Sequence, residues 1–127
     1  MKGLNELAAQ AYEASCNKGF YDKPVETGTR LMLIVSEVSE ALEADRRGIY
    51  CDLSDFDSET QVTPRTECDP FTDKFERHIK DTFEDEIADT FIRLLDLCGF
   101  MNIDIERHIA LKMQYNSLRS FKHGKSY

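Results

Sequence analysis

Apolar residues recur at helical spacing along most of the chain, and no stretch shows the alternation of a convincing β-strand. Residues 4–18, "LNELAAQAYEASCNK", carry apolar side chains at every third or fourth position, which predicts a first helix with Gly19 as its stop. Residues 28–46 repeat the pattern and predict a second helix, capped by Thr27 and ended by Gly48. The apolar stripe of this second helix consists of Leu31, Ile34, Val35, Val38, Ala41 and Leu42.

The helical pattern breaks over residues 49–68, "IYCDLSDFDSETQVTPRTEC", where Asp, Ser, Thr and Pro dominate. This composition predicts a long acidic loop inserted between helices. The "DP" pair that follows predicts a helix start, with Asp69 as the cap and Pro70 in the first turn.

A second break is expected near residues 80–82. The segment "TFED" at 82–85 resembles a capping box in which Asp85 replaces the usual Glu or Gln. The helix that starts there is expected to run to about Leu97 and to close at Gly99.

Asp104 is suited to cap a last helix that continues to about Ser117, followed by the basic tail "RSFKHGKSY". We therefore expect a single all-α domain over residues 1–127, built as a bundle of four or five helices with the acidic loop inserted at about 49–68.

The composition indicates the cellular compartment in which the protein is expected. No apolar stretch reaches the roughly 20 residues that span a membrane, and "MKGLNELAAQAYEAS" lacks the apolar core of a signal peptide. A cytoplasmic protein is therefore expected. The four cysteines form no CxxC pair and are interpreted as reduced structural thiols, with a metal site at Cys51 and Cys68 as the less favoured alternative.

The charge balance bounds the partners. With 24 acidic and 16 basic residues the chain carries a net charge of −8. Such a surface disfavours duplex nucleic acid and anionic membranes as partners. A small polyanionic substrate would be repelled too, unless cations stand between it and the carboxylates.

Two helices carry paired acids beside apolar residues. Glu37 and Glu40 lie about 60° apart on a helical wheel, next to the apolar stripe. Glu86 and Asp89, in "DEIADTFIRLL", repeat the spacing on the later helix between two apolar strips. If the apolar faces pack together, the four carboxylates converge.

Four converging carboxylates need counter-charge, because they repel one another and are costly to bury. Hard divalent cations supply it, and an all-oxygen site suits Mg²⁺ or Mn²⁺. Di-iron bundles usually carry a Glu-x-x-His pattern, which neither pair shows. The alternative is two solvated helix faces.

The last helix carries the basic patch of an otherwise acidic chain. Lys112, Asn116 and Arg119 share one face, and Lys125 follows in the tail. Their donors suit phosphate oxygens. A solvated basic terminus, favourable to the helix dipole, is the alternative.

The order of these motifs carries a resemblance. Glu37-x-x-Glu40, Glu86-x-x-Asp89 within "DEIADTFIRLLDL", the terminal "KMQYNSLR" and "HGKSY", and "NKGF" at 17–20 together resemble the MazG-like all-α nucleoside triphosphate pyrophosphohydrolases. The resemblance covers most of the chain apart from the acidic loop.

The resemblance implies Mg²⁺-dependent cleavage of an NTP or dNTP between the α and β phosphates by an oligomeric bundle, here a homodimer or homotetramer. Glu37 and Glu40 are both candidates for the general base, and the sequence does not choose between them. The family's metal-binding acids match Glu37, Glu40, Glu86 and Asp89, and its phosphate contacts match Lys112, Asn116, Arg119 and Lys125 more loosely.

The base and the sugar stay open. Residues 41–85, 45 in all, separate the two acid pairs, which is more than is usual in the family. A base needs a flat apolar partner, and Phe20 in "GFYD" is the candidate, with a core position as its alternative. The rival functions are a related pyrophosphohydrolase acting on phosphoribosyl-ATP or dUTP, and a non-enzymatic helical interaction module.

Overall fold

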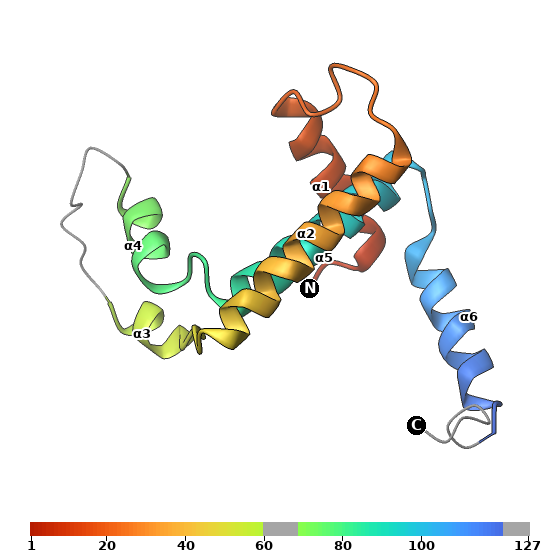
Figure 1. Ribbon diagram of the computed structural model, residues 1–127. Helices are drawn as coiled ribbons and strands as arrows, with labels where there is room; N and C mark the ends of the chain where they lie inside the picture. Colours follow the sequence, from red (N-terminus) through yellow and green to blue (C-terminus); the bar gives the residue numbers. More distant parts are fainter. Residues whose placement is uncertain (60–68, 121–127) are drawn as a thin grey trace. The chain divides into compact units, whose positions relative to one another are not determined.

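The structure, a computed structural model, describes residues 1–59 and 69–120 (Figure 1). Within these ranges the chain is all-helical, with six helices and no strand. The helices are α1 (Leu4–Asn17), α2 (Thr27–Arg46), α3 (Leu53–Ser58), α4 (Pro70–His78), α5 (Phe83–Phe100) and α6 (Ile105–Ser117). The all-α prediction is thus confirmed for the described residues. The candidate phosphate contact Lys125 lies outside them, as does Cys68.

Contacts divide the chain into two compact units. Unit 1 comprises Met1–Pro24 and the chain from Leu94 onward, and unit 2 comprises Val25–Arg93. Helix α5 runs through the boundary, so its first part belongs to unit 2 and its last part to unit 1.

Several helix ends lie where the sequence predicted them, because local hydrogen bonds fix them. Asp69 and Asp104 accept from the backbone N–H groups of Thr72 and Arg107 and so cap α4 and α6. Gly48 ends α2 with φ 68°, in a Schellman arrangement in which Ile49 N–H donates to the Ala44 carbonyl at 2.9 Å.

Other helix ends differ from the predictions. Thr27 is the first helical residue of α2 rather than its cap, and Glu26 in the cap position makes no side-chain hydrogen bond. Helix α5 continues through Gly99 to Phe100, and the left-handed residue that follows it is Asn102, with φ 53°. Asn tolerates this conformation because its short polar side chain can bond locally.

The predicted acidic loop contains a helix. Asp52 accepts from the backbone N–H of Ser54 and so caps the six-residue α3, which brings the total above the four or five helices expected. The break predicted near 80–82 is present: α4 ends at His78, and the Thr82 hydroxyl accepts from Asp85 N–H at 3.3 Å where α5 begins. The Asp85 carboxylate reaches Asp81 N–H instead of Thr82 N–H, one residue off the usual capping box.

Within unit 1, Gly99 is a close-packing position, which explains why it does not stop α5. An added Cβ at Gly99 would lie 2.7 Å from the Tyr12 Cβ, and closer still to the Ala8 carbonyl oxygen of α1. Next to this contact, the ring of Tyr21 packs edge-on against Tyr12, and its hydroxyl donates to Asp96 at 2.8 Å.

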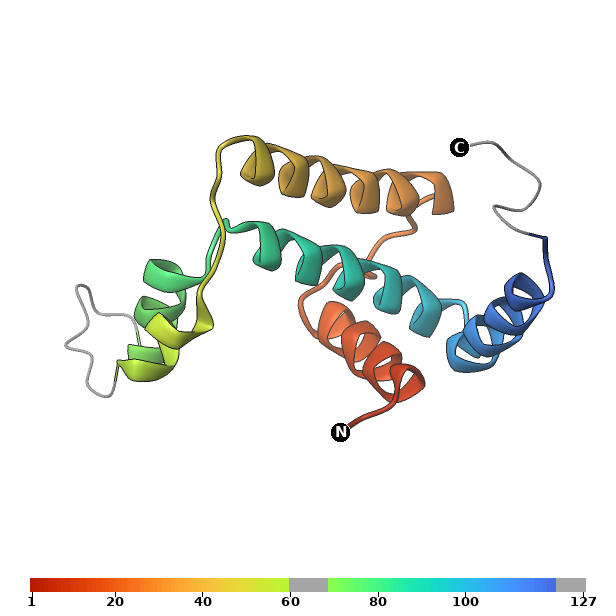
Figure 2. The same ribbon diagram turned by 90° about the horizontal axis from the view of Figure 1, so that it is seen from below.

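Within unit 2, α2 and the first part of α5 lie side by side and run antiparallel (Figures 1 and 2). The buried residues of α2 are Ile34, Glu37, Ala41 and Ala44. The buried face of α2 therefore includes two small side chains and one acid. Of the stripe read from the sequence, only Ile34 and Ala41 are buried, and the exposed members are Leu31, Val35, Val38 and Leu42.

Helices α3 and α4 form a hairpin whose two ends meet at one place. Phe83 N–H donates to the Ile49 carbonyl at 2.9 Å, and Cys51 N–H donates to the Glu84 carboxylate at 2.7 Å. Arg77 of α4 pairs with Glu59 beside α3 at 2.6 Å. The hairpin therefore leaves the α2–α5 pair and returns to it at the same point.

We expect Gly99→Ala to destabilise the protein by about 1–3 kcal/mol, because the methyl group would be forced against α1. Gly28→Ala is the matched control, since an added Cβ at Gly28 of α2 meets nothing within 4 Å. The control should leave stability unchanged or raise it by up to about 1 kcal/mol through helix propensity. Thermal denaturation followed by circular dichroism measures both, and equal melting temperatures for the two variants would contradict the close contact.

Candidate metal centre

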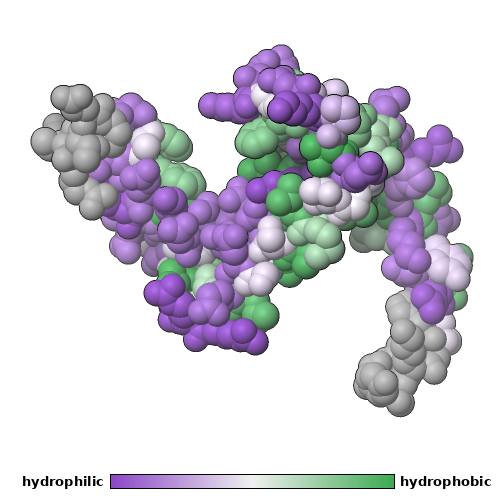
Figure 3. Space-filling model, turned by 45° about the horizontal axis from the view of Figure 1, so that its top comes forward, coloured by the Kyte–Doolittle hydropathy of each residue, from purple (hydrophilic) through white to green (hydrophobic). Residues whose placement is uncertain are grey.

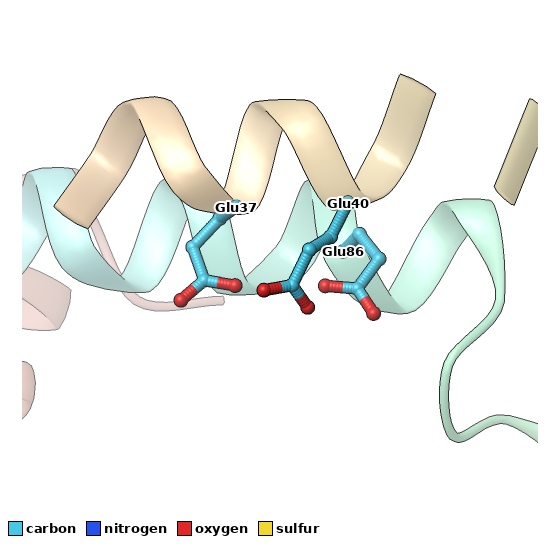
Figure 4. Close-up of side chains that lie close together, drawn as sticks. All are labelled: Glu37, Glu40 and Glu86. Atoms are coloured by element: carbon cyan, nitrogen blue, oxygen red, sulfur yellow. The ribbon is translucent and has the colours of Figure 1, made fainter. Parts of the chain in front are cut away.

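Three of the four predicted acids meet in unit 2. Glu37 and Glu40 of α2 and Glu86 of α5 each place a carboxylate oxygen within 4.8 Å of the others (Figure 4). Glu37 and Glu86 are buried, with 7% and 6% of their surface exposed, whereas Glu40 is exposed. The fourth predicted acid, Asp89, is exposed and lies outside this group of three. We call Glu37, Glu40 and Glu86 the carboxylate cluster.

Local structure explains the cluster. Glu37 and Glu40 are three residues apart and therefore neighbours on α2. Glu86 lies in the first turn of α5, where the helix dipole favours negative charge. The antiparallel pairing of α2 with α5 brings the two together.

The cluster is short of counter-charge. Burial, with the charge of Glu40 and neighbouring acids, raises the pKa of Glu86 to about 7. The pKa of Asp89 is raised as well, first by loss of water contact and then by the charge of Asp85. No described residue donates a hydrogen bond to the Glu86 side chain. A carboxylate that is almost completely buried and accepts no hydrogen bond is strongly stabilised by a nearby cation.

Arg93 supplies part of the missing counter-charge, although its sequence position alone predicts no role for it. Arg93 lies two turns after Glu86 on α5, and its Nε donates to Glu37 Oε1 at 2.5 Å. Arg93 and Glu86 are seven residues apart on α5 and share one face, but this spacing does not identify Glu37 of α2 as the partner of Arg93. Glu37 is therefore oriented by Arg93, whereas no described residue holds the Glu40 carboxylate.

A second acid group shares Glu86. Asp81, Asp85 and Glu86 also place oxygens within 4.8 Å of one another. Asp81 and Asp85 are already bonded to each other at the start of α5, so this group has a structural role in the helix start. The all-oxygen donor set of the carboxylate cluster fits Mg²⁺ or Mn²⁺, and the cluster contains neither the Cys nor the His that most zinc sites use.

A cavity of about 410 Å³ adjoins the cluster. Glu40, Asp85, Glu86 and Asp89 line its acidic side, and Phe71 and Phe75 of α4 line its apolar side. One cationic side chain, Lys80, is among the described residues that line it. Lys80 was missed because it lies in a break between helices, where helical spacing carries no information.

The remaining predicted residues lie in unit 1. Lys112 and Arg119 are exposed and lie over the ring of Tyr115, at 4.9 and 5.8 Å from its centroid, and Asn116 is half-buried in α6. Phe20 is 66% exposed, which rules out a position as a core plug. Its neighbour Tyr21 occupies the aromatic cluster of unit 1 instead.

No protein-family model matches the chain, and no curated protein or solved structure matches it either. Among the described residues, no helix has both the length and the apolar character that a membrane span requires. Cys16, Cys51 and Cys98 are free thiols.

Because Glu86 has a pKa of about 7 in the folded protein against an ordinary value of 4.5, the folded state holds the extra proton between these values. The free energy of unfolding should therefore fall as pH rises from about 5 to 8, by on the order of 1–3 kcal/mol. Thermal melting in the presence of a chelator measures this.

Glu86→Gln should remove most of that pH dependence, whereas Glu43→Gln, at an exposed position of α2, should retain it. A melting temperature that rises over the same pH range, or a wild-type slope in Glu86→Gln, would count against the buried carboxylate as its source.

Proposed function

We propose that the protein is a Mg²⁺-dependent nucleoside triphosphate pyrophosphohydrolase of the MazG-like type. It would cleave an NTP or dNTP between the α and β phosphates and release a nucleoside monophosphate and pyrophosphate. The observation that carries the proposal is the carboxylate cluster, in which the buried Glu86 has no hydrogen-bond donor among the described residues. Such a group fits a cation-dependent reaction on an anionic substrate better than it fits a solvated helix face.

The protein's own groups divide the work. Glu37, Glu40 and Glu86 would hold the cation, with Asp89 beside them. Bound Mg²⁺ supplies the positive charge that lets a triphosphate approach this acidic surface and that orients its α phosphate. Arg93 fixes the orientation of Glu37 through the bond from its Nε. Lys80, at the edge of the adjoining cavity, is suited to contact a phosphate oxygen.

Glu40 is our choice for the general base. Glu37 already accepts a hydrogen bond from Arg93, whereas Glu40 is exposed and held by no described residue. A carboxylate oxygen of Glu40 would take a proton from the attacking water, the water oxygen would bond to the α phosphorus, and pyrophosphate would leave. Lys112, Asn116, Arg119 and Lys125 stay candidates for phosphate contacts, and Phe20 stays a candidate for stacking on the base.

We also propose that the protein is a homo-oligomer, either a dimer or a dimer of dimers. Large apolar residues are exposed along α2 at positions 31, 35, 38 and 42, and on α5 Phe91 is 57% exposed. Hydrophobic residues reach the surface on the face drawn in Figure 3. A continuous apolar stripe of this kind marks an interaction surface, and closed symmetric assemblies are the usual way to cover it.

The reaction is tested by its products. With Mg²⁺ and a panel of nucleotides, the wild-type protein should release pyrophosphate and a nucleoside monophosphate. Glu86→Gln, Asp89→Asn and Glu40→Gln should each lower kcat by about two orders of magnitude or more, because each removes a charge from the site. Glu43→Gln should keep wild-type turnover. Release of inorganic phosphate with a diphosphate would refute the reaction class.

Metal binding is measured on the same protein variants as a shift in melting temperature. Mn²⁺ should raise the melting temperature of the wild type and should lose most of this effect in Glu86→Gln. A metal-independent melting temperature in the wild type, with no hydrolysis of any nucleotide, would favour the helical interaction module.

Self-association is tested by light scattering at micromolar concentration. The wild type should show a mass at least twice the 14.7 kDa of one chain. Val38→Glu should lower that mass, because it places a charge in the exposed apolar stripe. Ser39→Glu, the adjacent exposed position, is the matched control and should assemble as the wild type does. A monomeric wild type would overturn the assignment of this stripe to a second copy.

A further inference from the structure

Unit 2 contains a second and larger cavity, of about 750 Å³. We call it the apolar cavity. Leu53 of α3, Phe75 and Ile79 at the end of α4, and Ala88 and Ile92 of α5 form its apolar wall. Its volume lies within the range of sites that hold small organic ligands, roughly 300–1,000 Å³.

The apolar cavity adjoins the cavity of the carboxylate cluster. Phe75, Asp85 and Asp89 line both. On the helical wheel of α5, Asp85 and Asp89 separate Ala88 on one side from Glu86 on the other. A ligand that extends across this pair of acids would place one end at the carboxylate cluster and the other in the apolar cavity.

Among the described residues, the charged groups that line the apolar cavity are all carboxylates. They are Asp52, Glu84, Asp85 and Asp89. Glu84 is held in place because its Oε2 accepts from Cys51 N–H at 2.7 Å. Its Oε1 accepts from no described residue and is free to bind a donor of a ligand. An ionised carboxylate accepts hydrogen bonds and donates none.

From this arrangement we propose that the apolar cavity receives the base of the nucleotide, and that Glu84 favours a base with an amino group over uracil and thymine. The inference rests on the proposed function, which places the phosphates at the carboxylate cluster. Adenine, guanine and cytosine present amino donors to a carboxylate, whereas uracil and thymine present carbonyl oxygens on both sides of a single N–H.

The apolar cavity is a better site for a base than Phe20. A flat ring is bound most effectively when apolar walls cover several of its sides. Leu53 of α3, Phe75 of α4 and Ile92 of α5 line one open cavity, in which Leu53 and Ile92 are 59% and 52% exposed, whereas Phe20 provides a single exposed ring.

The test is calorimetric binding of non-hydrolysable α,β-methylene analogues of dATP and dTTP in the presence of Mn²⁺. Ala88→Phe places a ring at the lining of the apolar cavity and narrows it, so it should weaken binding of the dATP analogue at least tenfold. Ala110→Phe, at an exposed position of α6, is the matched control and should bind as the wild type does. The Mn²⁺-induced rise in melting temperature should be equal in all three proteins, which shows that the cluster is intact.

Selectivity is tested by Glu84→Gln. The wild type should bind the dATP analogue at least fivefold more tightly than the dTTP analogue, and Glu84→Gln should reduce that ratio to less than twofold. An amide at this position offers a donor as well as an acceptor, so it no longer rejects carbonyl oxygens.

Three results would overturn the proposal: wild-type affinity in Ala88→Phe, a wild type that binds neither analogue, or weakened binding in Phe20→Ala with none in Ala88→Phe. The two proposals can fail separately. If the wild type hydrolyses no nucleotide but binds the dATP analogue, and Ala88→Phe weakens that binding, the proposed reaction is refuted while the assignment of the apolar cavity as the base site is supported.

Discussion

Unit 2 depends on two helices that lie side by side where both carry acids (Figures 1 and 4). Ala41, Ala44 and Glu37 are buried on α2, and Glu86 is buried on α5. Burial of two carboxylates raises their free energy unless a proton, a guanidinium or a metal ion offsets the charge. Because the small and acidic side of α2 faces inward, its large apolar side chains face outward. The orientation of α2 therefore explains both the buried carboxylates of the cluster and the apolar side chains exposed on the surface.

The fold could be predicted where local chemistry decides it. Asp69 and Asp104 cap helices because a short carboxylate reaches the free N–H groups of the first turn, and this depends on neighbours in sequence alone. Gly99 misled the prediction because its role is tertiary: the missing side chain makes room for α1. The apolar stripe of α2 was predicted to be buried, but most of it is exposed. Helical spacing identifies an apolar face but not what covers that face.

The candidate site could be predicted in part. The acid–x–x–acid spacing found Glu37, Glu40 and Glu86, because helical geometry makes residues three apart neighbours. It placed Asp89 with them, but Asp89 lies on the ridge between the two cavities. Spacing could not find Lys80, whose place depends on the chain reversal between α4 and α5, nor the partner of Arg93, which lies 56 residues away on another helix.

The α3–α4 hairpin has a consequence for how such a protein can diversify. Its ends are joined by the bond between Phe83 N–H and the Ile49 carbonyl, so the segment between them forms a closed excursion from the α2–α5 pair. The hairpin side of the apolar cavity comes from this one stretch of sequence, whereas the carboxylate cluster comes from the helices that flank it. Exchange of the hairpin for another would reshape that wall and leave every cluster residue in place. Recombination at a single locus could thus change the shape of the apolar cavity independently of the carboxylate cluster.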